Sequence, residues 1–294
     1  MPYDVIVVGG SYAGMSAALQ VARARRKVMV IDAGLRRNRF AAHSHGFLTQ
    51  DGVDPARIAA TARKQLEAYP NLVWVDGEAS GARKSEAGFS VTTSDGDAHE
   101  TVRLVLALGV TDTLPEIDGL AERWGKSAFH CPYCHGYELG GGPIGILATG
   151  PVSMHQALLL ADWGPTTLLT RGIFEPDAEE LAQLAARGVS VERTPVSGIA
   201  GEADVLLADG RRLGFAGLFT VSQTQPSSAL AQDLGCALDE GPLGSYLRTD
   251  AMKQTTVPGV FACGDAARAA GSVSFAVGDG AMAGAAAHRS LIFS

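Results

Sequence analysis

Two cysteines separated by two residues, Cys131 and Cys134, offer the clearest chemistry in this sequence. Two thiols at this spacing can close a small disulfide ring, and the thiolate is the form that attacks another disulfide. A neighbouring imidazole or helix N-terminus lowers the pKa of a thiol, and His135 follows directly after the pair. We therefore interpret the pair as a redox-active disulfide, with His135 as the group that takes up or returns the proton.

Other uses of the same residues stay open as alternatives. A structural zinc site needs four ligands, and His130, Cys131, Cys134 and His135 are all local, without a second pair elsewhere in the chain. The C-x-x-C-H motif formed by Cys131, Cys134 and His135 also matches the motif for covalent haem attachment, which is normally found in exported proteins. Two unpaired buried cysteines are the remaining alternative.

The other reactive side chains favour structural roles. Cys236 and Cys263 are isolated in the sequence, and such cysteines are usually core residues. His43 and His45 make a poor metal site because no third ligand is apparent beside them. We expect these two histidines in a loop near a cofactor.

A glycine-rich turn near the N-terminus carries residues that bind a dinucleotide. The apolar run 3–8 ends at Gly9, and an Ala-rich helical stretch follows the turn. Backbone N–H groups at a helix N-terminus bind a pyrophosphate if no side chain blocks the approach, a condition that Gly9 and Gly14 meet. Ser11 replaces the middle glycine of the fingerprint. Asp32 ends the next apolar run, where a carboxylate accepts hydrogen bonds from a ribose.

A second strand, turn and helix pattern begins after the cysteine pair but has lost most of this fingerprint. Its turn, residues 147–153, keeps only Gly150, and Pro151 removes one N–H that a phosphate needs. No acidic residue ends the following strand, and Arg171 is the single candidate partner for a 2′-phosphate. The pattern predicts a nucleotide-binding fold whose site is weak or vacant.

The order of these patterns predicts two Rossmann-like α/β domains, with the second inserted into the first. The first domain comprises residues 1–116 and 245–294 and carries the glycine turn 9–14. The second domain, residues 117–244, carries the cysteine pair and the degenerate turn. A small-residue helix over 273–291 closes the first domain.

The composition is that of a soluble globular protein. Of the 294 residues, 46% are hydrophobic and 19% are charged, which argues against disorder, and no run of 18 apolar residues is present to span a bilayer. The net charge of −7 argues against nucleic acid or an anionic membrane as the main partner. No secretory leader is recognisable, so we expect a cytoplasmic protein.

The chain resembles the low-molecular-weight thioredoxin reductases, a type of pyridine nucleotide-disulfide oxidoreductase. The resemblance covers nearly the whole sequence. It rests on the turn 9–14 with Asp32, on the cysteine pair within the second domain, and on residues 257–265, which are similar to the second flavin motif of the family. It implies an FAD-binding first domain, an NAD(P)H-type second domain and a homodimer.

The same resemblance implies a role for each matching residue. The FAD pyrophosphate lies on the first turn, with Asp32 at the adenosine ribose, Asp265 at the ribityl chain and the start of the last helix near the pyrimidine end of the flavin. Cys134 faces the flavin, and Cys131 exchanges with the substrate. The residues expected to bind FAD are Gly9, Gly10, Ser11, Ala13, Gly14, Asp32, Asn38, His45, Gly46, Gly109, Gly264, Asp265, Ser272 and Val273.

Departures from the thioredoxin reductase pattern bear on the direction of electron flow. His135 stands where the family has an acidic aspartate, Gly271-Ser272 replace Arg-Gln, and the basic cluster that holds NADPH is largely missing. Cys-x-x-Cys-His-Gly with a degenerate second turn is similar to the dithiol oxidases of gliotoxin and holomycin biosynthesis. Those enzymes pass electrons from a substrate dithiol through the disulfide and FAD to oxygen.

These features predict an FAD-dependent thiol-disulfide oxidoreductase that oxidises a dithiol to a disulfide, with NADPH binding left open. The alternatives are an NADPH-dependent reductase of thioredoxin or a small disulfide, a flavin-containing redox sensor without turnover, and a zinc- or haem-binding protein. The expected partner is a small-molecule dithiol or disulfide, or a thioredoxin-like protein.

Overall fold

The computed structural model describes residues 1–293, which form two compact units. The first unit comprises Met1–Arg39, Phe47–Thr111 and residues 224–293, and the second comprises Phe40–Gly46 and Asp112–Gln223. The chain therefore leaves the first unit twice, once for a seven-residue excursion and once for the body of the second unit.

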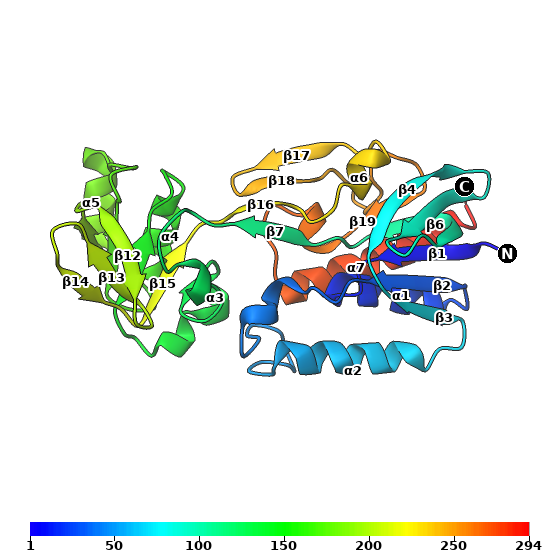
Figure 1. Cartoon of the computed structure of the whole chain (residues 1–294), viewed down its shortest axis with the longest axis horizontal. Helices are drawn as coiled ribbons and strands as arrows, with labels where there is room; N and C mark the ends of the chain where they lie inside the picture. Colours follow the sequence, from blue (N-terminus) through cyan, green and yellow to red (C-terminus); the bar gives the residue numbers. More distant parts are fainter. Residues whose placement is uncertain (294) are drawn as a thin grey trace. The chain divides into compact units, whose positions relative to one another are not determined.

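The first unit is built on a seven-stranded sheet in the order β3-β2-β1-β6-β5-β4, with β19 paired to β6 (Figure 1). Strands β3, β2, β1, β6 and β19 run parallel, whereas β4 and β5 are antiparallel additions. Most of β1 and β2 is buried, as expected for parallel strands covered on both faces. The strands are β1 (Tyr3–Val8), β2 (Val28–Asp32), β3 (Leu72–Asp76), β4 (Ala79–Ser85), β5 (Gly88–Thr93), β6 (Ala98–Leu106) and β19 (Val260–Ala262).

Helices α1 and α7 lie side by side against this sheet (Figure 1). Their backbones approach closely because α7 has glycines at the contact: a Cβ at Gly280 or Gly284 would overlap the carbonyl oxygen of Ala13 or Ala17. The helical segments of this unit are α1 (Tyr12–Arg23), η1 (Arg37–Phe40), α2 (Pro55–Glu67), α6 (Leu230–Asp233), η4 (Gly264–Ala267) and α7 (Val273–Ser290).

A smaller sheet in the order β17-β18-β16-β7 explains why residues 224–244 belong to the first unit. The sequence placed them in the second domain. In the structure β16 pairs with β18, and Leu230 and Leu234 of the α6 region bury their side chains in the same core as β4. The strands of this sheet are β7 (Val110–Thr113), β16 (Gln223–Pro226), β17 (Leu238–Gly241) and β18 (Gly244–Leu247).

The second unit contains a five-stranded parallel sheet in the order β11-β10-β9-β15-β8 and a three-stranded antiparallel sheet, β12-β13-β14. Its strands are β8 (Ala128–Phe129), β9 (Ile144–Leu147), β10 (Thr166–Leu169), β11 (Ser190–Glu192), β12 (Val196–Ala200), β13 (Asp204–Leu207), β14 (Arg212–Gly214) and β15 (Gly217–Thr220). Its helical segments are η2 (Ala121–Arg123), α3 (Pro132–His135), η3 (Tyr137–Leu139), α4 (Ser153–Leu160) and α5 (Ala178–Ala186).

Both units have a parallel β-α-β core, so the predicted fold class of two Rossmann-like α/β domains, one inserted into the other, is confirmed. Within residues 1–293, no helix combines the length and the apolar character needed to cross a membrane.

Candidate active site

The first glycine turn leaves the start of α1 open to an anion. Gly9 has a φ of 99°, and a Cβ at Gly14 would overlap the Gly9 carbonyl oxygen, so both positions require glycine. Ser11 is the N-cap of α1, but its side chain makes no capping hydrogen bond. The N–H groups of Tyr12, Ala13 and Gly14 consequently have no acceptor among residues 1–293. Free donors at the start of a twelve-residue helix fit a pyrophosphate.

Asp32 lies beside this turn at the end of β2. The N–H of Gly10 donates a 3.0 Å hydrogen bond to Asp32 Oδ1, and the second carboxylate oxygen has no partner among the described residues. A Cβ at Gly10 would come within 2.6 Å of both Asp32 and Trp74. The carboxylate is thus held against the turn with one oxygen left for a ribose hydroxyl.

A buried polar pair lies next to the start of α1. Tyr12 Oη donates to the carbonyl of Pro55 at 3.2 Å and accepts from Asn38 Nδ2 at 3.2 Å. Burial raises the pKa of Tyr12, so the phenol keeps its proton. Asn38 Oδ1 is buried without a hydrogen-bond partner in the described chain. A buried acceptor of this kind costs free energy until a donor reaches it, which fits a hydrogen-bond donor of a bound flavin.

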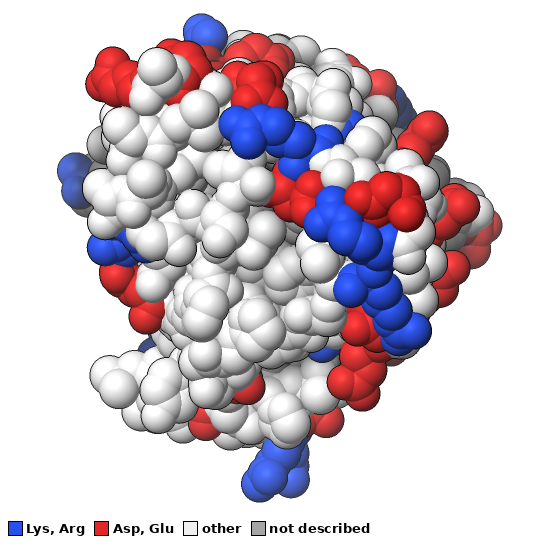
Figure 2. All heavy atoms as spheres, turned by 90° about the vertical axis from the view of Figure 1, so that its left-hand side faces the viewer, with Lys and Arg blue, Asp and Glu red and all other residues white. Residues whose placement is uncertain are grey.

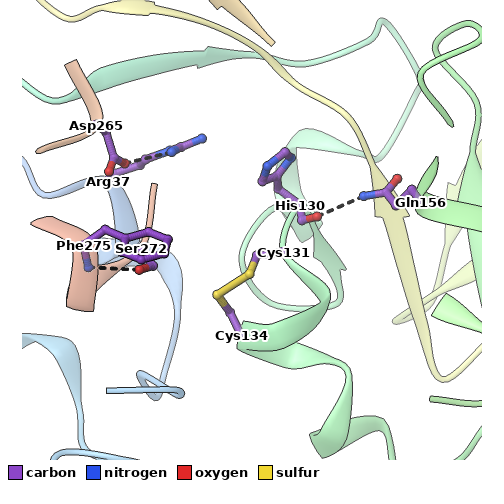
Figure 3. Close-up of a disulfide and its surroundings, with 8 residues drawn as sticks. All are labelled: Arg37, His130, Cys131, Cys134, Gln156, Asp265, Ser272 and Phe275. Carbon is purple, nitrogen blue, oxygen red and sulfur yellow. Dashed lines mark hydrogen bonds and ion pairs between the residues drawn. A yellow bond between two sulfur atoms is a disulfide. The ribbon is translucent and has the colours of Figure 1, made fainter. Parts of the chain in front are cut away.

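The second flavin motif is held by an ion pair that sequence reasoning missed. Arg37 Nη1 lies 2.8 Å from Asp265 Oδ2, and these residues are far apart in the chain (Figure 3). A Cβ at Gly271 would overlap the Asp265 carboxylate, so the backbone closes over this side chain. Ser272 Oγ accepts the Phe275 N–H at 3.2 Å and caps α7, which begins at Val273 (Figure 3).

Two more glycines predicted at the flavin have left-handed backbones. Gly264 has a φ of 72° and starts η4, and a Cβ there would contact Ala13 of α1 at 2.8 Å. Gly109 has a φ of 66°, and its carbonyl accepts the N–H of Ser227 at 3.2 Å. Both residues lie in the first unit with the glycine turn.

The cysteine pair forms a disulfide in the second unit. Cys131 precedes the one-turn helix α3, and Cys134 lies within it. Gln156 Nε2 of α4 donates a 2.9 Å hydrogen bond to the His130 carbonyl oxygen (Figure 3). This bond holds the residue before Cys131 in place. The sequence suggested a helix N-terminus or an imidazole as the thiol activator. One turn of helix has a weak dipole, which leaves the imidazole of His135.

His135 is a neutral imidazole near neutral pH. Its ring stacks on Phe129 with the centroids 4.2 Å apart, and burial, assisted by the charge of His45, lowers its pKa to about 4. It can accept a proton from a thiol, but it cannot hold that proton for long. This behaviour suits a transient base beside the disulfide.

His45 and Gly46, predicted at the flavin, pack in the second unit beside the cysteine segment. His45 Nδ1 is 3.3 Å from Glu138 Oε1, and the Cβ position of Gly46 is 3.8 Å from the carbonyl oxygen of Tyr133. The structure therefore brings these residues together with the cysteine pair, and a role at the flavin stays a prediction.

The second glycine turn bonds several of its own donors within the chain. The Thr149 N–H donates to the fully buried Ser153 Oγ at 2.9 Å, and the Ser153 N–H donates to the Gly150 carbonyl at 3.0 Å. The Met154 N–H likewise bonds the Pro151 carbonyl at 3.1 Å. These bonds use donors that a bound pyrophosphate would need at the start of α4.

Arg171, the one candidate for a 2′-phosphate, bonds back to the chain through one of its nitrogens. It has a φ of 60°, and its Nη1 donates to the Ala148 carbonyl at 2.9 Å. Figure 2 views the face on the left of Figure 1, where charged side chains border a broad area that carries none. The other basic residues of 112–223 each donate to a carboxylate or a backbone carbonyl: Arg123, Lys126, Arg187, Arg193, Arg211 and Arg212.

The remaining cysteines are core residues, as predicted. Cys236 and Cys263 are free and buried, and burial raises the pKa of Cys263 to about 12. Among residues 1–293, no three His, Cys, Asp or Glu side chains gather into a group that could hold a metal ion.

Comparison with known proteins identifies the family. The model of the family "Pyridine nucleotide-disulphide oxidoreductase" matches residues 3–280. The chain belongs to this family. The recognition made from the glycine turn, the cysteine pair and the second flavin motif is thereby confirmed, and so is the prediction of an FAD-dependent enzyme.

Relatives within the family match along the whole chain. "Thioredoxin reductase tcpT" of Claviceps purpurea is 33% identical over 305 residues, covering 98% of this chain and 94% of the relative. "Thioredoxin reductase sirT" of Leptosphaeria maculans is 30% identical, covering 96% and 92%.

Solved structures are also similar to this chain along its whole length. An oxidoreductase from Agrobacterium tumefaciens has a TM-score of 0.97 and 59% identity, covering 100% of this chain and 99% of that one. HlmI has a TM-score of 0.92 and 36% identity, covering 99% and 93%.

The first unit of this oxidoreductase fits FAD in three respects. The turn at Gly9 and Gly14 offers free N–H donors, Asp32 has an unused carboxylate oxygen, and Asn38 has an unpartnered acceptor. Only the glycines and Asp32 had a clear local signal. Arg37 adjoins Asn38 in sequence, but nothing local connects it to Asp265.

Replacing Asp32 with alanine is expected to raise the Kd for FAD by about 10- to 100-fold, because a hydrogen bond to a charged carboxylate contributes roughly 1.5–3 kcal/mol. Titration of the apoprotein with FAD, followed by fluorescence, measures this change. Asp4→Ala is the control, since Asp4 Oδ2 also accepts a backbone N–H, that of Lys27 at 2.7 Å. An Asp32→Ala protein with the wild-type Kd would contradict the ribose assignment.

His135 is expected to make the protein less stable in acid. Its pKa lies near 4 when folded and near 6.5 when unfolded. Stability is therefore fully present above pH 6.5 and declines as the pH falls toward 4, by about 2 kcal/mol between about pH 7.5 and about pH 5. Urea unfolding of the wild type and of His135→Gln at both pH values isolates this contribution. Equal pH dependence in the two proteins would show that His135 is not the buried neutral group.

Proposed function

We propose that this enzyme oxidises a substrate dithiol to a disulfide through Cys131 and Cys134, with oxygen as the final electron acceptor. The observation that carries the proposal is the state of the second glycine turn. Three of its N–H groups, those of Thr149, Ser153 and Met154, are already bonded within the chain, and so is Arg171 Nη1. This argues against a phosphate site for NADPH, whereas the redox disulfide is formed.

The exchange steps follow from thiol chemistry. A substrate thiolate attacks Cys131 Sγ and breaks the Cys131–Cys134 bond, and Cys134 leaves as a thiolate. The second substrate thiolate attacks the substrate sulfur of this mixed disulfide, which releases Cys131 and the product disulfide. The cysteine pair is then in its reduced, dithiol form and carries the electron pair taken from the substrate. FAD bound in the first unit would supply the two-electron redox chemistry that links the reduced cysteine pair to oxygen. The electron pair and the two protons lost by the substrate thiols would together convert oxygen to hydrogen peroxide.

His135 supplies the base for these steps. A thiol must lose its proton before it attacks, and the substrate brings two thiols. The imidazole of His135, which follows Cys134 in the chain and is neutral near neutral pH, is the proton acceptor in this proposal. The FAD site in this proposal consists of the turn residues 9–14, Asp32, Asn38 and the segment 264–273.

A second candidate is an NADPH-dependent reductase of thioredoxin or of a small disulfide. The similarity to tcpT and sirT, both named thioredoxin reductases, favours it. The self-bonded second turn argues against it.

The proposal includes a cytoplasmic homodimer acting on a small-molecule dithiol. Free Cys236 and Cys263 support a reducing compartment, where structural disulfides are rare. The homodimer follows from the resemblance to thioredoxin reductases. Light scattering of the purified enzyme tests the dimer.

Oxygen consumption tests the function. With excess dithiothreitol as the probe dithiol, we expect continuous oxygen uptake and an equal amount of hydrogen peroxide. With a redox sensor that does not turn over, oxygen uptake would stop after about one equivalent of oxygen per enzyme. Oxidation of NADPH in the presence of thioredoxin or a small disulfide, without oxygen uptake from dithiothreitol, would establish the reductase instead.

A further inference from the structure

Tyr133 carries an exposed aromatic ring inside the redox motif. It lies between Cys131 and Cys134 in sequence, on the one-turn helix α3, and is 69% exposed. Consecutive Cα atoms are about 3.8 Å apart, so the Cα of Tyr133 lies within about 8 Å of that of either cysteine. Single exposed rings are common on protein surfaces, and exposure alone therefore indicates no function.

A second ring, that of Trp163, holds Tyr133 in one orientation. The two ring centroids are 5.4 Å apart and the ring planes are nearly perpendicular at 86°, which is the edge-to-face geometry that aromatic pairs favour. Trp163 is itself partly buried against the core of the second unit. It approaches α3 closely because Gly136 has no side chain: a Cβ there would lie 2.6 Å from Trp163 Cδ1. Tyr133 thus presents a ring that is already oriented, which reduces the side-chain entropy lost when a ligand stacks on it.

The stretch that carries Tyr133 is uncharged near neutral pH. Residues 131–137 contain no Asp, Glu, Lys or Arg. Burial lowers the pKa of His135 to about 4, so its imidazole is neutral. The next residue, Glu138, has its Oε1 3.3 Å from His45 Nδ1. A charged ligand placed over this stretch would lose hydration without gaining an opposite charge from it, whereas an apolar one would gain ring contact.

The exchange chemistry brings the substrate to this ring. A substrate thiolate attacks Cys131 Sγ, a new sulfur–sulfur bond forms, and the Cys131–Cys134 bond breaks with its electron pair on Cys134. The substrate is then covalently attached two residues from Tyr133. The body of a small dithiol is consequently within reach of the exposed ring while the mixed disulfide lasts.

We propose that Tyr133, held by Trp163, selects small uncharged dithiols that carry a flat aromatic body. The inference rests on the proposed dithiol oxidation and names its substrate class. The flat body stacks on the Tyr133 ring as the substrate sulfur bonds to Cys131, which raises kcat/KM relative to a dithiol of the same ring-closing geometry without an aromatic body. Tyr133 is thus a specificity-determining residue and takes no part in electron transfer.

Two probe dithiols that differ mainly in their body test this selection. Both ortho-benzenedimethanethiol and dithiothreitol carry two alkyl thiols and close a cyclic disulfide of the same ring size, but only the first has an aromatic ring. Anaerobic stopped-flow mixing with the FAD-loaded enzyme gives the second-order rate constant for flavin reduction by each. We expect Tyr133→Ala to lower the ratio of the aromatic to the non-aromatic rate constant about 5-fold. Tyr133→Phe keeps the ring and should keep the ratio within about two-fold of wild type.

Tyr137 provides the matched control. It is 85% exposed and lies four residues farther along the same stretch, on η3. Among residues 1–293 no ring pairs with it, so its side chain is not held as that of Tyr133 is. Tyr137→Ala should leave the ratio within about two-fold of wild type.

The ratio separates selection from damage to the fold, because a disturbance of α3 slows both dithiols alike. An unchanged ratio in Tyr133→Ala overturns the inference, even if both rate constants fall. So does a drop of equal size in Tyr137→Ala or in Tyr133→Phe. A wild-type enzyme whose flavin neither dithiol reduces would instead refute the proposed function, so the two failures are distinguishable.

Discussion

Cys134→Ser is expected to lower the rate of flavin reduction by a dithiol at least about 1000-fold, the scale at which loss of a covalent catalytic group acts. Serine cannot form the disulfide that a substrate thiolate attacks, so the electron pair has no path from the substrate. Anaerobic mixing of the FAD-loaded variant with dithiothreitol measures the loss.

The remaining cysteines provide the control for this experiment. Cys236 is free, buried and remote in sequence from the pair, and Cys236→Ser should keep the rate within about two-fold of wild type at equal FAD content. Cys131→Ser should fail as completely as Cys134→Ser. Full retention of the rate in Cys134→Ser would refute the disulfide route.

The second large effect concerns flavin binding. Gly14→Ala is expected to bind less than about a tenth of the FAD that the wild type binds, because its Cβ would overlap the Gly9 carbonyl oxygen and displace the turn that presents the free N–H groups. The FAD content of the purified protein, read from its absorption spectrum, measures the effect.

Gly278→Ala is the matched control. Gly278 lies on the exposed side of α7, and a Cβ there would have nothing within 4 Å. This variant should keep the wild-type FAD content and gain slightly in helix propensity. Circular dichroism shows whether Gly14→Ala folds without FAD. A folded Gly14→Ala protein with full FAD content would contradict the account of the turn.

Sequence reasoning succeeded where the cause is local. The β1–turn–α1 unit follows from an apolar run, the glycines at 9 and 14 and an Ala-rich helix, all within 23 residues. The disulfide follows from two cysteines three positions apart, with Cys131 as the N-cap of the one-turn helix that contains Cys134. Each of these features is determined by side chains close together in the chain.

Long-range contacts were beyond such reasoning. Arg37 and Asp265 are separated by 228 positions, and neither residue indicates the other. Residues 224–244 return to the first unit through the pairing of β16 with β18, which the local pattern did not predict. The same holds for the seven-residue excursion that carries His45 to Glu138.

The two glycine turns show how one supersecondary pattern can differ in binding capacity. At α1 the N-cap Ser11 leaves its hydroxyl unused, and the first N–H groups are free. At α4 the Ser153 hydroxyl bonds back to the Thr149 N–H and closes the turn. The sequence predicted a weak second site from the missing glycines, and this bond adds a physical reason.

The direction of electron flow is tested most directly by anaerobic mixing of the FAD-loaded wild-type enzyme with dithiothreitol or with NADPH. We predict that the dithiol bleaches the visible flavin absorbance and that NADPH leaves it unchanged on the same timescale. Rapid bleaching by NADPH, with none by the dithiol, would contradict the account.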